Sequence, residues 1–463
     1  MELTKQELGR VRFANTLLTI ENQQLRNENQ QLRKENQKLR QDCDKFVNEI
    51  AVLKHKKTSN NSSIAPSKDE NRLKTTSLRE KSGKTNGGQI GHEGITLDFI
   101  ANPDKIEPHK PDYCTSCGAE LTSDAILKET RQVIDIPPIK PIVTEHRIFS
   151  RTCACGVCTV GEFPQSVNGK VSYGPTVEAL CGYLSVRQYV SINRIEEIFR
   201  DVFGIQISQG TIVNRINTLA NKCTDTYELI RSKVEQSKCV GVDETGCKVN
   251  KAKMWGWAWQ TPSLTYIAVS DNRGYETINI NFPKGLPNAV LVHDCWSAHF
   301  KTACKIHQLC LEHIRRELKY FTENGDAPWA KSFTKFILGA QKLKKSILAN
   351  PTKSFRIEIA QTKDELEKLL KETHQITVKG ELTLANRLLK HKNYILPFLD
   401  YRFVPPDNNG SERAMRNYKV KLKVSGFFKT LIGAQNYAVI RSVTDTTIKN
   451  GGSPLNALSL LNC

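Results

Sequence analysis

The chain has 463 residues, 39% of them hydrophobic, which excludes a disordered protein and allows about three domains. Lys and Arg outnumber Asp and Glu by 67 to 48, giving a formal net charge of +19, so we expect a polyanionic partner, either nucleic acid or an anionic membrane surface. The sequence has no run of about 18 apolar residues and no apolar signal core, which argues against a membrane partner and predicts a soluble, unexported protein of the cytoplasm.

Residues from about 10 to 54 show a seven-residue repeat that is typical of a coiled coil. One apolar heptad position holds Leu18, Leu25, Leu32, Leu39, Phe46 and Leu53. The other holds Asn15, Asn22, Asn29, Asn36, Cys43 and Ile50. Asn at this position favours a two-stranded coil in register, because each buried amide needs a matching amide opposite. We therefore expect residues 1–54 to form a parallel homodimer; a solvated helix that does not self-associate is the alternative.

Residues 55–100 are poor in apolar residues and rich in Ser, Asn, Gly and Lys, which predicts a flexible basic linker. Between positions 54 and 84 there are nine Lys or Arg and three acidic residues. This segment could attach to phosphate without sequence preference, or serve only as a solubilising tether.

Five cysteines with metal-ligand spacing lie in residues 101–170: Cys114, Cys117, Cys153, Cys155 and Cys158. Residues 133–150, between the two clusters, alternate in hydrophobicity and carry β-branched residues as a hairpin does. Two Cys pairs at the ends of a hairpin predict a zinc ribbon, in which four of the five thiolates hold a structural Zn²⁺. The second pair is either Cys153 with Cys155 or Cys155 with Cys158, and unrelated reduced cysteines are the alternative.

Residues 171–236 are predicted to be all-helical. From Ile192 onward a helix, a Gly-containing turn and an amphipathic helix follow each other as in a helix-turn-helix. The second helix would present Gln209, Thr211, Asn214 and Arg215 to a DNA groove. We expect a helical DNA-binding domain; a plain helical bundle is an equally good interpretation of the pattern.

Residues 237–463 begin with three successive predicted strands, SKCVGVDETG, KMWGWAWQT and LTYIAVSD, and continue with a helix and a fourth strand, AVLVHDCW. Asp243 lies in the first strand, Asp294 closes the fourth, and Glu412 follows 118 positions later in a polar loop that turns into a helix. This gap is too long for one loop, so residues 303–399 are interpreted as a helical insertion. The order of elements predicts an α/β ribonuclease H-like domain, in which these carboxylates converge.

Converging carboxylates can hold two Mg²⁺ ions for work on a phosphodiester. Asp243 and Asp294 would bridge the ions and Glu412 would hold one of them. Each carboxylate alone is more typical of a cap or a surface group. Glu244 adjoins Asp243 but should point to the opposite face of the strand.

The segment DNNGSERAMRNYKVKLKV is rich in candidate phosphate-binding residues. Arg416 lies four positions after Glu412 and should share its helix face. Lys419, Lys421 and Lys423 alternate with apolar residues, which predicts one basic edge that faces DNA. The predicted DNA-binding residues are Arg413, Arg416, Lys419, Lys421, Arg215 and Arg316.

The segment HQLCLEHIRREL places His307, Cys310 and His313 at three-residue steps, after Cys304. A second metal site is conceivable, but three-residue steps drift around a helix, which favours a packing face. Arg315 and Arg316 could contact phosphate.

Together these motifs resemble the DDE transposases of the insertion sequence 66 type. The resemblance covers nearly the whole chain: the coiled coil, the linker ending in GGQIGHEG, CTSCG, VDETG, LVHDCW, HQLCLEHIRREL and NNGSERAMR with the following KVSGFF. It implies a ribonuclease H-like domain with the triad Asp243, Asp294 and Glu412, and a Mg²⁺-dependent cut-and-join reaction. It also implies double-stranded DNA, the terminal inverted repeats of the element, as the partner. Whether accessory proteins of the element are further partners is left open by the sequence.

The leading hypothesis is therefore a nucleoid-associated transposase that binds, cleaves and joins the ends of a mobile DNA element. Two alternatives remain open at this point. One is a non-catalytic dimeric DNA-binding protein, and the other is a stand-alone nuclease of the same fold.

Overall fold

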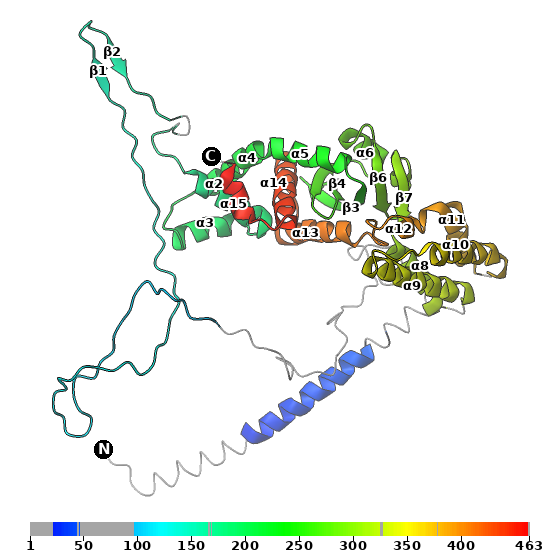
Figure 1. Cartoon of the computed structure of the whole chain (residues 1–463), viewed down its shortest axis with the longest axis horizontal. Helices are drawn as coiled ribbons and strands as arrows, with labels where there is room; N and C mark the ends of the chain where they lie inside the picture. Colours follow the sequence, from blue (N-terminus) through cyan, green and yellow to red (C-terminus); the bar gives the residue numbers. More distant parts are fainter. Residues whose placement is uncertain are drawn as a thin grey trace. The chain divides into compact units, whose positions relative to one another are not determined.

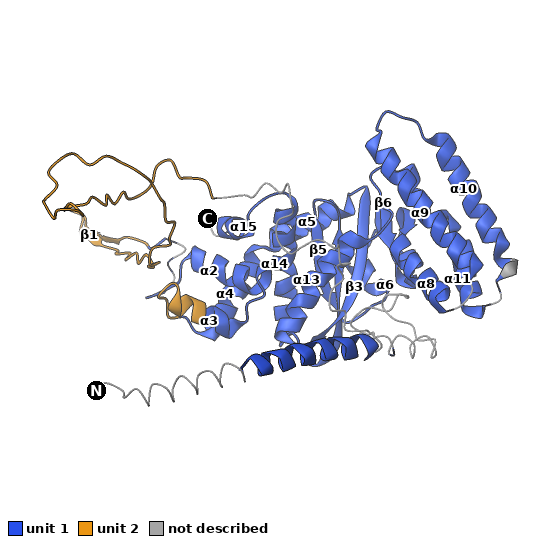
Figure 2. Cartoon of the chain, turned by 90° about the horizontal axis from the view of Figure 1, so that it is seen from below, with its two compact units in different colours: residues 1–74, 163–196, 207–463 blue, residues 75–162, 197–206 orange. Residues whose placement is uncertain are grey.

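The computed structural model describes residues 22–43, 46, 97–164, 167, 169–324, 327–376 and 378–461 (Figure 1). The chain divides into two compact units (Figure 2). One holds residues 1–74, 163–196 and 207–463, and the other holds residues 75–162 and 197–206. Within the described ranges no helix combines the length and the hydropathy that crossing a membrane requires.

Residues 22–43, in the middle of the predicted coiled coil, form a helix. Leu25, Leu32 and Leu39 leave a half-exposed apolar stripe along it. The side-chain amides of Asn29 and Asn36 donate to the carbonyls one turn back, at 3.0 Å. The ends of the predicted coil and nearly all of the predicted linker lie outside the described residues, so the dimer stays a prediction.

The second unit contains a two-stranded antiparallel sheet of β1 (Ser150–Thr152) and β2 (Cys158–Val160). The prediction that residues 133–150 form a hairpin is wrong, because only Ser150 of that segment lies in a strand. Pro137, Pro138 and Pro141 interrupt the segment, and Pro has no backbone N–H to donate to a strand ladder.

Residues 171–236 are helical, as predicted. The helices are α2 (Pro175–Gly182), the π-helical η1 (Tyr183–Arg187), α3 (Ile192–Asp201), α4 (Gln209–Lys222) and α5 (Thr224–Glu235). Gly204, in the turn between α3 and α4, has a φ of +65°. Ser208 caps α4 by accepting the Thr211 N–H at 3.2 Å. Helix α2 lies tightly on α4, since a Cβ at Gly182 would come within 2.2 Å of Leu219.

A five-stranded sheet forms the centre of the first unit, and its strand order is β5-β4-β3-β6-β7. Its elements, in chain order, are β3 (Cys239–Val249), β4 (Ala252–Gln260), β5 (Thr265–Ser270), α6 (Tyr275–Asn281), β6 (Leu286–His293), α7 (Ser297–Phe300) and β7 (Cys304–Leu309). β3 pairs antiparallel with β4, and β4 with β5, whereas β3, β6 and β7 are parallel. The four predicted strands are present.

Strand β7 was not predicted, because the sequence indicated a helical region from residue 303. Ile306 and Leu309 are the only large aliphatic residues in CKIHQL, so its alternation is weak. Pairing with β6 supplies the backbone partners that make this segment a strand.

The region that follows β7 is helical from residue 311 onward, as predicted, while its interpretation as an insertion stays a prediction. It consists of α8 (Leu311–Asn324), α9 (Pro328–Ala349), α10 (Arg356–Lys371), η2 (Glu372–Gln375), α11 (Lys379–Lys390), η3 (Lys392–Tyr394) and α12 (Pro397–Asp400). Its buried side chains, such as Phe333 and Leu384, share one core with Val290 and Val292 of β6 and Leu309 of β7. The insertion is therefore joined to the sheet by apolar contacts.

Three helices end the chain: α13 (Asn409–Ser425), α14 (Leu431–Lys449) and α15 (Pro454–Leu460). α13 lies on β3 and β4 at two glycines. A Cβ at Gly241 would stand 2.5 Å from the Ser411 hydroxyl, and one at Gly256 would stand 2.8 Å from the Tyr418 ring. The Asn408 amide donates to the Val242 carbonyl at 2.7 Å. These contacts hold the first turn of α13 against the middle of β3.

Strand β7 also buries His307, which the sequence left open as a metal ligand. His307 Nδ1 lies 3.0 Å from His293 Nε2, and its Nε2 lies 3.5 Å from Cys304 Sγ. Burial, with the neighbouring histidines, lowers the pKa of His307 to about 4.

This pKa predicts acid sensitivity of the fold. The folded-state pKa lies below the ordinary value of 6.5, so the stability contributed by neutral His307 is present above pH 6.5 and is lost as pH falls towards 4. Between pH 7 and pH 5, we expect the wild type to lose about 2 kcal/mol more unfolding free energy than His307→Gln. Urea denaturation across this range measures the difference, and parallel pH profiles for the two proteins would contradict it.

Candidate active site

The three candidate carboxylates lie on elements that the topology brings together. β3 and β6 are parallel neighbours, with Gly241 opposite Val292. Asp243 stands on β3 two residues beyond that pair, and Asp294 stands two residues beyond it just after the end of β6, so the two are expected to lie side by side. Glu412 lies in the first turn of α13, the turn that packs on Gly241.

The carboxylates interact electrostatically. Burial, first, and then the charges of Glu244, Asp294 and Glu412 raise the pKa of Asp243 well above its ordinary value, while Lys419 opposes the shift. Like charges gathered in a buried place are unfavourable unless a cation or a proton joins them. The donor set is carboxylate oxygen, the hard ligand that Mg²⁺ prefers, so these residues fit a divalent ion.

Glu244 lies on the opposite face of β3 from Asp243, as strand alternation predicts. Its side chain is 1% exposed and is held by Arg273 Nη2 at 2.7 Å and by His299 Nε2 at 3.2 Å. Burial tends to raise the pKa of Glu244, but His299 and Arg273 hold the pKa below its ordinary value.

His299 connects this buried carboxylate to the candidate site. Its Nε2 lies 3.2 Å from a Glu244 oxygen and 3.5 Å from Asp294 Oδ1. Asp294 Oδ1 also accepts the Trp296 N–H at 2.9 Å, and the Trp296 ring lies 3.9 Å from the Arg273 guanidinium. His299 was not predicted from the sequence. Its position five residues after Asp294, on a short helix at the strand end, was the available signal.

Glu412 is surrounded by side chains from α8 and from its own helix. Arg316 Nη2 lies 3.4 Å from both carboxylate oxygens, Arg416 Nη2 lies 3.7 Å from Oε2, and His313 Nε2 lies 3.9 Å from Oε1. Arg416 therefore shares the face of Glu412, as predicted. Arg316, which is remote in sequence, lies closer.

Cys310, His313 and Glu412 offer ligand atoms within 4.8 Å of one another, the one such group in the part of the chain that the structure describes. Burial raises the pKa of the Cys310 thiol to about 12, and its sulfur accepts the Asn408 N–H. The thiol is thus protonated at neutral pH, and thiolate is the form that binds metal. The histidines of this motif do not share a helix, because His307 lies on β7.

The basic residues of α13 do not form the predicted edge. The helix continues to Ser425, and side chains two positions apart on a helix point in different directions, so Lys419, Lys421 and Lys423 are spread around it. The single basic edge predicted from the alternation in KVKLKV is therefore wrong. Lys421 donates to the Ser185 carbonyl at 3.4 Å, and burial lowers its pKa. Arg413 is exposed.

Arg215, on α4, lies partly buried against the core. Its Nη1 stands 3.8 Å from the buried carboxylate of Glu178, which also binds Lys222 at 2.8 Å. Of the other residues predicted to face a groove, Asn214 is exposed, and Gln209 donates to Glu196 at 2.9 Å.

The cysteines of the second unit lie in two similar turns. The Gly118 N–H donates to the Cys114 carbonyl, and the Gly156 N–H donates to the Cys153 carbonyl, both at 2.9 Å. Both glycines have a positive φ, +72° and +86°. Cys117 and Cys155 each directly precede their glycine. The second turn is therefore the first turn shortened by one residue, with Cys158 outside it on β2.

Backbone N–H groups surround the first thiol of each turn. They lower the pKa of Cys114, chiefly through Cys117, and the pKa of Cys153, chiefly through Cys155. A thiolate held in this way is suited to Zn²⁺. The two turns are not brought together into one group of ligands in this structure.

Comparison with protein-family models matches residues 170–436 to the family described as "Transposase IS66 family". Residues 111–156 match the "zinc-finger binding domain of transposase IS66". The first match covers more than half of the chain and includes all three carboxylates. The second ends before Cys158. The search of curated proteins found no match.

Because the carboxylates repel one another, we expect removal of one of their charges to stabilise the folded protein. Asp243→Asn removes the buried charge, and its amide oxygen can still accept the Glu244 N–H that Asp243 accepts at 3.0 Å. In EDTA we expect the Tm of the variant to exceed that of the wild type by a few degrees, since about 1 kcal/mol moves Tm by about 2–4 °C in a domain of this size. Calorimetry measures it, with Asp364→Asn on exposed α10 as the unchanged control. A lower Tm for Asp243→Asn would contradict the argument.

The Glu244 network predicts the opposite effect. Glu244→Ala leaves His299, which is fully buried, and Arg273 without their carboxylate. Removing one partner of a buried pair costs about 3 kcal/mol of unfolding free energy. Urea denaturation tests this, and the exposed Glu365→Ala on α10 should lose almost nothing. Equal unfolding free energies for Glu244→Ala and Glu365→Ala would show that Glu244 does not stabilise His299 and Arg273.

Proposed function

The chain belongs to the IS66 family of transposases, and on that premise we propose that it binds the ends of a mobile DNA element and catalyses their metal-dependent cleavage and strand transfer. The observation that carries this proposal is electrostatic: the charges of Asp294 and Glu412 both raise the pKa of Asp243, and the strands that lead to Asp243 and Asp294 are parallel neighbours. The sheet order supports assignment to the ribonuclease H-like fold, because three antiparallel strands are followed by two parallel ones.

Asp243, Asp294 and Glu412 would hold two Mg²⁺ ions. When bound, these ions would lower the pKa of an attacking water or 3′-hydroxyl and stabilise the leaving oxygen. The raised pKa of Asp243 supports this role, since a divalent cation relieves the repulsion among the carboxylates.

Other residues would position the groups that react. Arg316 and Arg416 place guanidinium groups beside Glu412, where they can bind the phosphate that is attacked. His299, held by the buried Glu244, would fix the carboxylate of Asp294. The rim of the site would therefore bind the polyanion while its centre binds cations.

The remaining parts would bind and align the DNA. We assign Cys114, Cys117, Cys153 and Cys155 as the ligands of a structural Zn²⁺, because these four lie in the two turns of similar geometry. The leucine stripe of residues 22–43 supports a homodimer. The terminal inverted repeats of the element, as double-stranded DNA, would be the partner.

The test is an in vitro strand-transfer assay with Mg²⁺ and DNA that carries the element's ends. We expect Asp243→Asn and Glu412→Gln to lower the joining rate at least about 100-fold, because each removes a metal-binding carboxylate, while end binding persists. Asp364→Asn, on exposed α10, is the matched control and should join normally.

Three outcomes of this assay are distinguishable. Normal joining by both triad variants would refute the catalytic proposal. Binding by the wild type without cleavage would favour a DNA-binding protein. Cleavage without joining to a supplied 3′-hydroxyl end would favour a nuclease.

A further inference from the structure

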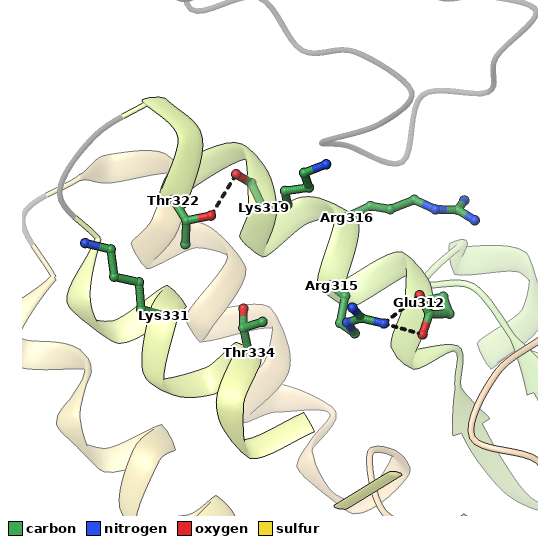
Figure 3. Close-up of a pocket in the computed structure, with 7 residues that line it drawn as sticks. All are labelled: Glu312, Arg315, Arg316, Lys319, Thr322, Lys331 and Thr334. Carbon is green, nitrogen blue, oxygen red and sulfur yellow. Dashed lines mark hydrogen bonds and ion pairs between the residues drawn. The ribbon is translucent and has the colours of Figure 1, made fainter. Parts of the chain in front are cut away.

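The insertion carries a polar pocket whose function the proposed reaction does not explain. It lies along α8 and α9, has a volume of about 430 Å³ and is drawn in Figure 3. Helix α8 contributes Arg315, Lys319 and Thr322, and helix α9 contributes Lys331 and Thr334. Large apolar or aromatic side chains are absent from its lining, which argues against a pocket for a drug-sized ligand or for stacked bases.

The pocket is positively charged. Its lining holds four Lys or Arg and one acidic residue, Glu312. That carboxylate is already engaged, since it accepts from Arg315 at 2.8 and 3.0 Å and from Gln341 at 3.1 Å. Lys319 lies 3.4 Å from Glu323, a half-exposed pair of little energetic value. A phosphate oxygen can therefore compete for the lysine.

One end of the pocket meets the candidate active site. Arg316 lines the pocket, and its guanidinium extends away from α9 (Figure 3) to within 3.4 Å of Glu412. The α8 residues of the lining recur at three- and four-residue steps and so follow one helix face. From Arg316 to Thr322 this face spans about 9 Å at about 1.5 Å per residue.

We propose that this α8–α9 pocket binds the phosphodiester backbone of the DNA strand that enters the carboxylate site. The inference rests on the proposed function and assigns the helical insertion a part in DNA binding. Lys side chains suit phosphate contacts, which position a strand and carry no sequence information. The pocket should therefore contribute equally to binding of end DNA and of unrelated duplexes.

The test uses the full-length protein in EDTA, so that no chemistry intervenes. The variant Lys319→Gln/Lys331→Gln removes two charges from the pocket. The matched control, Lys368→Gln/Lys390→Gln, removes two charges from exposed positions on α10 and α11 outside it. The dissociation constant of an end duplex is measured against salt concentration for each protein, and circular dichroism verifies that both variants fold.

Each phosphate contact contributes about 0.9 to the slope of log affinity against log salt. We expect the slope of the pocket variant to be shallower than that of the wild type by about two, and the slope of the control to be unchanged. A random-sequence duplex should give the same difference.

Equal slopes for pocket variant and wild type, or an equal loss in the control, would overturn the proposal. If the wild type joins DNA ends with Mg²⁺ and the slopes are equal, only the pocket proposal fails. If the wild type neither binds nor joins the ends, the proposed function fails as well.

Discussion

The close packing of α13 on β3 determines where Glu412 lies relative to Asp243. It depends on Gly241, where any larger side chain would collide with Ser411, and on the Asn408 amide that bonds to the β3 backbone. Gly241 lies two residues before Asp243 on β3. Asn408 lies four residues before Glu412, at the start of α13. A helix that is remote in sequence is thereby placed on β3, the first strand of this sheet along the chain. No local sequence pattern could predict this placement.

The distribution of charge follows from this packing. The centre holds Asp243, whose pKa is raised by burial and by the neighbouring carboxylates, and the rim holds Arg316 and Arg416. On the other face of β3, the buried carboxylate of Glu244 lies 2.7 Å from Arg273 Nη2 and 3.2 Å from His299 Nε2. A site that is negative inside and positive at its edge matches a cation within and a polyanion across it. Repulsion among the carboxylates lowers the stability of the fold at the centre of the site, and a bound cation would relieve that repulsion.

The sequence predicted the parts of this arrangement that depend on local pattern. Asp243 was placed in a strand and Asp294 at the end of one because apolar β-rich runs precede them, and the structure shows that these two strands pair in parallel. The strand at residues 304–309 was missed because its partner β6, and not its own composition, makes it a strand. The hairpin prediction for residues 133–150 was wrong because the segment contains three prolines, which cannot donate to a strand ladder although the hydrophobicity alternates. His299 was missed because its role arises only from contacts across the fold.

If Asp243, Asp294 and Glu412 form one metal site, iron-mediated backbone cleavage should report all three at once. Fe²⁺ in place of Mg²⁺, with ascorbate and peroxide, generates hydroxyl radicals that cut the chain near its ligands. The account predicts cleavage close to Asp243, Asp294 and Glu412 together, suppressed by excess Mg²⁺ and lost from all three segments in Asp294→Asn. Cleavage at one segment alone, or an unchanged pattern in that variant, would contradict it.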